Sequence, residues 1–120
     1  MKKIKILTVG IVAILTIGCS SRADMYRIKI DVASKQSDGK EWDLMGGSPD
    51  IKVLVDKQSL GLSPSCRDTY RCSYDFSSKN DKWYIEIYDS DIDSDDLIGK
   101  GDCEEGEECR LGMAIINISD

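Results

Sequence analysis

Apolar side chains recur at every second position in several short segments, and this spacing constrains the fold more than any other feature of the sequence. The clearest segments are 26–32, 51–55 and 83–88. A period of two places the apolar side chains on one face of an extended chain, so each segment is predicted to be a half-buried β-strand. A further strand is predicted over 113–118, with less regular ones over 70–76 and 97–101.

Turn-forming residues separate these segments, and helical spacing is missing from the sequence. Gly46-Gly47-Ser48-Pro49 and Lys79-Asn80-Asp81 are two of the turn signals. No window of eleven or more residues has the apolar spacing of an amphipathic helix. Short strands about ten residues apart therefore predict one small all-β domain, an antiparallel sandwich.

The N-terminus has the pattern of an export signal. Met1–Lys5 is basic, Ile6–Ile17 is apolar and carries no charge, and Gly18-Cys19 follows directly. A transmembrane helix needs about 20 apolar residues, so this stretch is too short to span a membrane. Its length and basic flank are typical of a secretory signal peptide.

The segment Thr16-Ile17-Gly18-Cys19 resembles the lipobox of bacterial lipoproteins. The resemblance implies that Cys19 is lipidated and becomes the mature N-terminus. The chain then divides into a signal peptide over 1–18, a lipidated tether over 19–24 and a folded domain over 25–120. A lipid-anchored protein of the bacterial cell envelope is implied, and Ser20 favours the outer membrane if the cell is Gram-negative. An ordinary cleaved signal followed by an unrelated cysteine is the alternative.

Four cysteines remain after Cys19, and in an exported chain an even number predicts disulfides. They are Cys66, Cys72, Cys103 and Cys109. The spacing favours two local bridges, 66 with 72 and 103 with 109, and crossed pairing remains open. A four-cysteine zinc site fits less well, because its ligand pairs are usually two to four residues apart.

Five aspartates lie within the eight residues from Asp89 to Asp96, directly after the predicted strand over 83–88. Carboxylates that repel one another at a strand end have two explanations. A hard cation that takes oxygen ligands is one, and a solvated acidic loop is the other.

A second aspartate-bearing loop favours the cation. Asp43 and Asp50 lie at opposite ends of one glycine-containing loop, just before the predicted strand over 51–55. A sandwich gathers its loops at two ends, so this loop and the acidic run are predicted to meet at one tip. Calcium takes six to eight oxygens, which requires ligands from more than one loop. The predicted ligands are Asp43, Asp50, Asp89, Asp91 and Asp96.

The two loops together resemble those of C2 domains, whose calcium ligands are aspartates on two apical loops. Asp43 and Asp50 match the aspartate pair of the first loop, and Asp89 and Asp91 match the pair of the later loop. Asp96-Leu97-Ile98-Gly99 matches the third aspartate, which two apolar residues and a glycine follow.

The resemblance covers about 25–120 and has two departures. Ile51-Lys52 stands where the family has proline and tyrosine, and the later loop is one residue short between Asp91 and Asp96. The resemblance implies an all-β, eight-stranded antiparallel Greek-key sandwich with calcium as its cofactor.

Charge and composition argue against two classes of function. The net charge is −6, and all the acidic residues lie after the predicted signal peptide, so the domain is expected to repel nucleic acid. Without a bound cation it is also expected to repel anionic lipid headgroups. The chain has no histidine, which excludes imidazole-based catalytic triads, and no enzyme activity is expected.

Two classes of function remain. The first is a calcium-dependent module that is tethered to a membrane and engages lipid headgroups or an envelope protein. The resemblance implies contact through apolar loop tips, here Leu44, Met45 and Ile92. The second is a structural or adaptor lipoprotein of the cell envelope that works without calcium.

Overall fold

The structure is a computed structural model, which describes residues 23–35, 39, 47–91 and 94–120. Several residues of the predictions above lie outside this part of the chain. They are the signal peptide 1–18, Cys19, Asp43, Leu44, Met45 and Ile92. In the described part, no helix has both the length and the apolar character that a membrane crossing requires.

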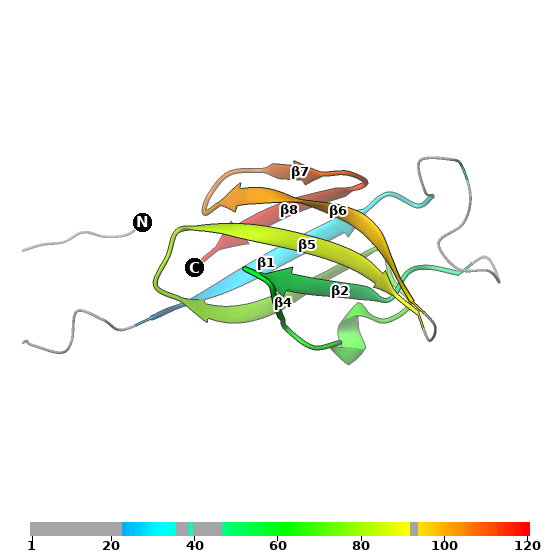
Figure 1. Cartoon of the computed structure of the whole chain (residues 1–120), viewed down its shortest axis with the longest axis horizontal. Helices are drawn as coiled ribbons and strands as arrows, with labels where there is room; N and C mark the ends of the chain where they lie inside the picture. Colours follow the sequence, from blue (N-terminus) through cyan, green and yellow to red (C-terminus); the bar gives the residue numbers. More distant parts are fainter. Residues whose placement is uncertain (1–22, 36–38, 40–46, 92–93) are drawn as a thin grey trace, which may run out of the picture.

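The described residues form two antiparallel four-stranded sheets packed face to face (Figure 1). The strands are β1 (Asp24–Val32), β2 (Ile51–Val55), β3 (Gln58–Ser59), β4 (Arg71–Ser78), β5 (Lys82–Ser90), β6 (Asp95–Glu104), β7 (Cys109–Leu111) and β8 (Ala114–Ser119). One sheet has the order β4-β1-β8-β7 and the other the order β3-β2-β5-β6. The predicted all-β antiparallel sandwich is thus confirmed.

The chain passes repeatedly from one sheet to the other, so strands that pair are often distant in sequence. β1 lies between β4 and β8, and β5 lies between β2 and β6. This is the Greek-key type of connection, in which a strand returns to pair with a much earlier one. β2, β5 and β6 are adjacent and antiparallel. The start of β2, the end of β5 and the start of β6 therefore lie together at one end of the sheet.

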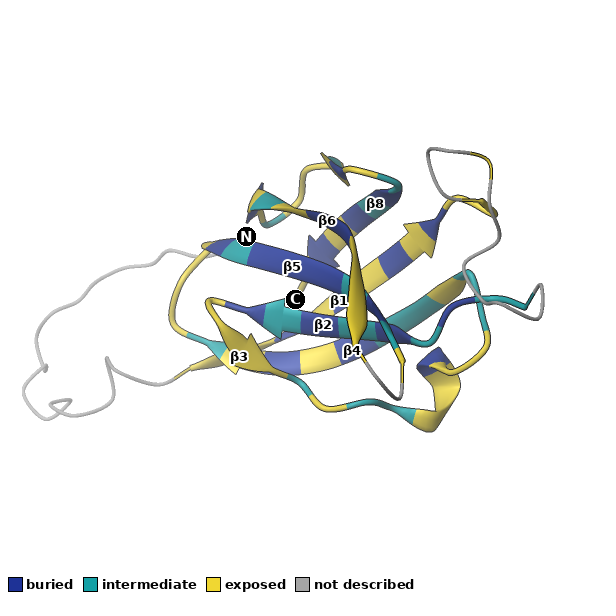
Figure 2. Ribbon diagram, turned by 45° about the vertical axis from the view of Figure 1, so that its right-hand side comes forward, coloured by how far each residue is buried: buried dark blue, intermediate teal, exposed yellow. Residues whose placement is uncertain are grey.

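The core lies between the sheets and is built by the period-two pattern (Figure 2). β1 alternates exposed and buried positions from Met25 to Val32, and its apolar side chains face inward. Tyr26, Phe76 and Trp83 pack together, and the rings of Tyr26 and Trp83 meet edge to face with 4.8 Å between centroids. The three strands predicted from the period of two are therefore present with the expected face buried, and the other predicted strands overlap β4, β6 and β8.

The structure extends the predictions in the acidic region. β6 begins at Asp95 rather than at residue 97, and β5 continues to Ser90. The acidic run is consequently a β-hairpin rather than a long loop. The short strands β3 and β7 and the 3-10 helix η2 (Pro64–Cys66) were not predicted, because two or three residues show no period.

Two disulfides close local loops, as the cysteine spacing favoured. Cys66 pairs with Cys72, and Cys103 pairs with Cys109. The first bridge joins the end of η2 to β4, and the second joins β6 to β7. Each bridge therefore holds a short element against a longer strand.

Candidate metal site

Three aspartates from the β5–β6 hairpin lie together at the end of the sandwich. Asp89 is near the end of β5, Asp96 is near the start of β6, and Asp91 lies in the connection between the two strands. Asp89 is directly opposite Asp96 in the β5–β6 pairing. A register shift beside Ile87 and Tyr88 produces this alignment. Strand pairing therefore brings together carboxylates that are seven residues apart in the sequence.

Asp89 is buried because it continues the inward-facing side of β5. Trp83, Ile85 and Ile87 face the core, and the next residue in that alternation is Asp89, which is only 2% exposed. The same period that builds the hydrophobic core thus places a carboxylate at its margin. A buried carboxylate needs hydrogen-bond donors or a cation to offset the loss of water.

The structure gives the Asp89 carboxylate only part of that compensation. Its Oδ1 accepts a hydrogen bond from the backbone N–H of Asp50 at 3.0 Å. Its Oδ2 is buried and has no hydrogen-bond partner among the described residues. Burial raises the pKa of Asp89 from 3.8 to about 6; the hydrogen bond from Asp50 lowers it, and the charges of Asp91, Asp50 and Asp96 raise it further. The site therefore holds a carboxylate whose charge the described protein atoms do not neutralise.

Asp91 and Asp96 complete a group that could hold a metal ion. One carboxylate oxygen of each of Asp89, Asp91 and Asp96 lies within 4.8 Å of the others, and Asp91 and Asp96 are exposed. Oxygen donors of this kind suit a hard cation such as calcium, which takes six to eight oxygens. The donor set and the unpartnered Oδ2 both fit such an ion, with water or carbonyl oxygens supplying the remaining ligands.

Asp50 lies beside this group, and its oxygens bond the backbone of two neighbouring segments. Asp50 accepts a hydrogen bond from Ser90 N–H at its carbonyl (2.8 Å) and one from Asp68 N–H at Oδ1 (2.7 Å). Asp50 is not one of the three residues whose oxygens converge. The predicted meeting of the first loop with the acidic run is seen at Asp50, while Asp43 lies outside the described residues.

Asp95 belongs to the other face of the hairpin and has a different partner. Its Oδ2 lies 2.9 Å from Nζ of Lys52, and this hydrogen bond lowers the pKa of Asp95. The ion pair was not predicted from the sequence. The signal was present, however, because adjacent residues of a strand point to opposite faces, so Asp95 and Asp96 have to diverge.

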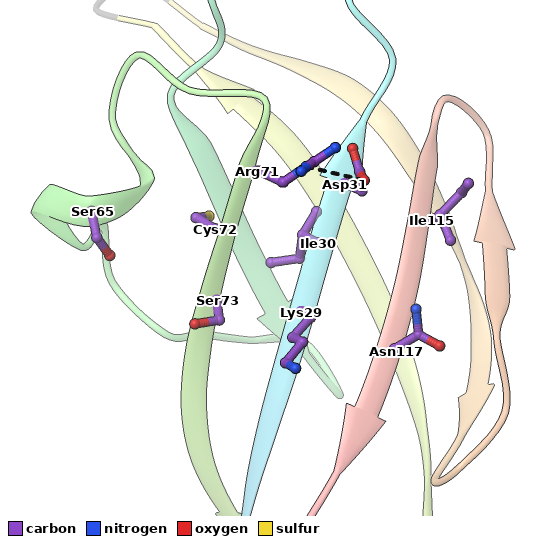
Figure 3. A pocket seen from close by; sticks show the side chains of 9 residues that line it. All are labelled: Lys29, Ile30, Asp31, Ser65, Arg71, Cys72, Ser73, Ile115 and Asn117. Carbon is purple, nitrogen blue, oxygen red and sulfur yellow. Dashed lines mark ion pairs between the residues drawn. The ribbon is translucent and has the colours of Figure 1, made fainter.

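A groove lies on the outer face of the other sheet, across β4, β1 and β8 (Figure 3). This groove has a volume of about 640 Å³ and is lined by Lys29, Asp31, Arg71, Ser73 and Asn117 among others. Arg71 Nε lies 3.3 Å from Asp31 Oδ2. The groove contains one carboxylate and two cationic side chains, so it does not provide the ligands of a cation site.

No protein family and no curated protein sequence matches this chain. Its structure is similar to that of a C2 domain, with 23% sequence identity and a TM-score of 0.47 over 80% of this chain and 98% of that domain. It is also similar to a C2 domain protein from Ramazzottius varieornatus, with 14% identity and a TM-score of 0.42 over 81% of this chain and 87% of that protein.

Proposed function

We propose that this chain is a bacterial lipoprotein whose sandwich binds calcium at Asp89, Asp91 and Asp96 and thereby engages anionic lipid headgroups. The observation that carries the proposal is the carboxylate of Asp89, which is 2% exposed and whose Oδ2 has no hydrogen-bond partner in the part of the chain that the structure describes. An uncompensated buried carboxylate is costly. A bound divalent cation would offset that cost and would also relieve the repulsion from Asp91 and Asp96.

The three aspartates differ in exposure, and this difference suits a site that shares its ion with a ligand. Asp89 is buried and would hold the ion from the protein side, whereas Asp91 and Asp96 are exposed at the surface. Calcium supplies a positive charge with flexible coordination, which accommodates oxygens from water or from a phosphate group. Without the ion, the acidic domain repels anionic headgroups; the ion would offset most of the local negative charge and would itself be available to a phosphate oxygen.

An apolar side chain lies next to the acidic group. Leu97 follows Asp96 in β6 and is 47% exposed, one of two large apolar side chains in the described residues with that much exposure. It could contact lipid acyl chains once the headgroup is bound. The loop-tip residues predicted from the sequence for this role, Leu44, Met45 and Ile92, lie outside the described residues.

The first strand enters the sandwich at the end opposite the acidic group. β1 begins at Asp24, which pairs with Ser78, whereas its other end is at the same end of the sandwich as the turn between β5 and β6 (Figure 1). A strand of nine residues is about 30 Å long. The five residues from Cys19 to Asp24 span at most about 18 Å. A lipid at Cys19 would therefore leave the calcium site directed away from the anchoring membrane, toward a second surface.

Vesicle sedimentation tests the proposal. The purified protein with Cys19→Ala, which removes the anchor, should sediment with phosphatidylserine vesicles in calcium and remain in solution with EDTA. Asp91→Asn should lose the calcium-dependent sedimentation. Asp81→Asn, an exposed aspartate at the opposite end of β5, should keep it. Calcium binding without sedimentation would favour a protein partner instead, and no effect of calcium at all would favour the adaptor function.

A further inference from the structure

The loop closed by Cys66 and Cys72 contacts the segment that leads into β2. Within this loop, Asp68 N–H donates to Asp50 Oδ1 at 2.7 Å, and Thr69 N–H donates to the carbonyl of Pro49 at 2.9 Å. Two consecutive backbone amides of the disulfide loop thus hold two consecutive residues of the neighbouring segment. No ligand of the proposed cation site belongs to the loop itself.

The held segment in turn contacts the buried carboxylate. Asp50 N–H donates to Asp89 Oδ1 at 3.0 Å, and the Asp50 carbonyl accepts from Ser90 N–H at 2.8 Å. Asp50 is therefore fixed between the disulfide loop on one side and the end of β5 on the other. The hydrogen bond to Oδ1 leaves Oδ2 as the oxygen of Asp89 for which residues 23–35, 39, 47–91 and 94–120 provide no partner.

The conformation of the loop depends on its own constraints. Asp68 has a left-handed backbone (φ 51°), which few residues adopt without support from their surroundings. Cys66 is fully buried. The Thr69 hydroxyl donates to the Arg71 carbonyl and accepts from the Arg71 N–H. The disulfide joins the two ends of this turn and limits how far it can open.

We propose that the Cys66–Cys72 loop is the positioning element of the cation site, an inference that rests on the proposed calcium function. The loop holds Asp50, and Asp50 holds Asp89 in the orientation that faces Asp91 and Asp96. Residues that orient a metal ligand without touching the metal typically change its affinity by about 10- to 100-fold when they are removed. Opening the loop should therefore weaken calcium binding although every ligand is retained.

The second disulfide provides a matched control. Cys103 and Cys109 are also six residues apart, so both bridges close loops of equal length. In the loop-entropy description, equal loops give equal stabilisation. Cys103 pairs with Trp83 near the start of β5, at the opposite end of that strand from Asp89. Removing this disulfide should lower the stability of the fold without changing the arrangement of the acidic group.

The test is calcium chloride calorimetry on the purified full chain and two double variants. Cys66→Ala/Cys72→Ala should weaken calcium binding by about tenfold or more. The calcium affinity of Cys103→Ala/Cys109→Ala should remain within about twofold of that of the wild type, because this disulfide is distant from the acidic group. Equal affinities in the wild type and the first variant, or equal losses in both variants, would overturn the inference alone. An absence of calcium binding to the wild type would overturn the proposed function as well.

Hydrogen exchange on the wild-type chain gives a second readout that needs no variant to fold. Coupling between two positions is reciprocal, so calcium should slow the exchange of the Asp68 and Thr69 amides if their loop orders the site. Gly106 lies in the other disulfide loop, and its amide donates to the Ile118 carbonyl. The exchange rate of this amide should not change with calcium. Unchanged exchange at Asp68 and Thr69 in calcium-saturated protein would contradict the positioning role.

Discussion

The backbone N–H of Asp50 donates to Oδ1 of Asp89 over 3.0 Å and joins the entrance of β2 to the end of β5. The contact satisfies one oxygen of a buried carboxylate, and no other described residue bonds the second oxygen. A cation is the natural complement of that second oxygen, because Asp91 and Asp96 present their carboxylates to the same point.

The pH dependence of stability should report on Asp89. Its pKa in the folded state is about 6, above the ordinary value of 3.8, so the folded state binds the proton more tightly than the unfolded state does. Stability from this group is therefore present at low pH and is lost as the pH rises from about 4 to about 6. Calcium-free Asp89→Asn, which does not titrate, should lack this loss.

Thermal melts in EDTA across this pH range measure the difference between the wild type and Asp89→Asn. Near neutral pH the variant should be the more stable of the two, because it removes an uncompensated charge. A wild-type curve that runs parallel to that of the variant at every pH would show that Asp89 titrates normally.

Gly99 allows β6 to pack directly on the turn between β7 and β8. A Cβ at Gly99 would collide with the backbone carbonyl of Leu111, and Met113 N–H donates to the Ile98 carbonyl beside it. Backbone atoms cannot move aside as a flexible side chain can. Gly99→Ala should therefore lower the free energy of unfolding by about 3 kcal/mol in urea denaturation.

Gly106→Ala separates this clash from ordinary backbone strain. Gly106 has a left-handed backbone (φ 82°) but open space around its Cα. Its replacement should cost about 1–2 kcal/mol, the penalty of that conformation alone. A loss at Gly99 no larger than at Gly106 would contradict the close packing.

The two disulfides should be complete in native protein that is isolated without a reductant. Mass spectrometry without reduction should find two bonds, Cys66 with Cys72 and Cys103 with Cys109. Each bridge closes a short loop, so its removal should cost about 2 kcal/mol. Four alkylatable thiols in the untreated domain would contradict this pairing.

The lipid anchor proposed at Cys19 has a direct test in cells. Cys19→Ala should release the protein from membrane fractions or block its processing, because the acyl chains would be lost. One acyl chain binds a membrane only marginally, so firm attachment of the wild type implies more than one. Full retention in membranes of a variant that is processed normally would contradict lipidation.

The sequence predicted the strands well because a half-buried strand has a period of two that is visible over five or more residues. β1 and β5 follow that period throughout, apart from the buried Glu86 on the other face of β5. β3 and β7 were not predicted, because they are too short to show a period of two. Their places depend on pairing with β2 and β8, which is a tertiary contact.

The candidate site was predicted in part. The aspartate spacing identified the acidic region, and the sandwich fold predicted that it meets the loop ending at Asp50; the structure shows that meeting in the hydrogen bond from Asp50 to Asp89. The spacing did not reveal that Asp89 is buried and that Asp95 faces Lys52. The burial of Asp89 depends on the continuation of β5 to Ser90, and the position of Asp95 depends on a register shift in the β5–β6 pairing. Neither is fixed by local sequence.

The most direct test of the central claim is the melting temperature of the wild-type protein in EDTA and in millimolar calcium. Calcium at a hundredfold excess over its dissociation constant adds about 2.7 kcal/mol of stability. For a domain of this size that corresponds to a rise of roughly 10 °C or more. Magnesium should do less, because it requires tighter octahedral geometry. Asp89→Asn should abolish the rise and Asp81→Asn should retain it, whereas a wild-type melting curve that calcium leaves unmoved would contradict the account.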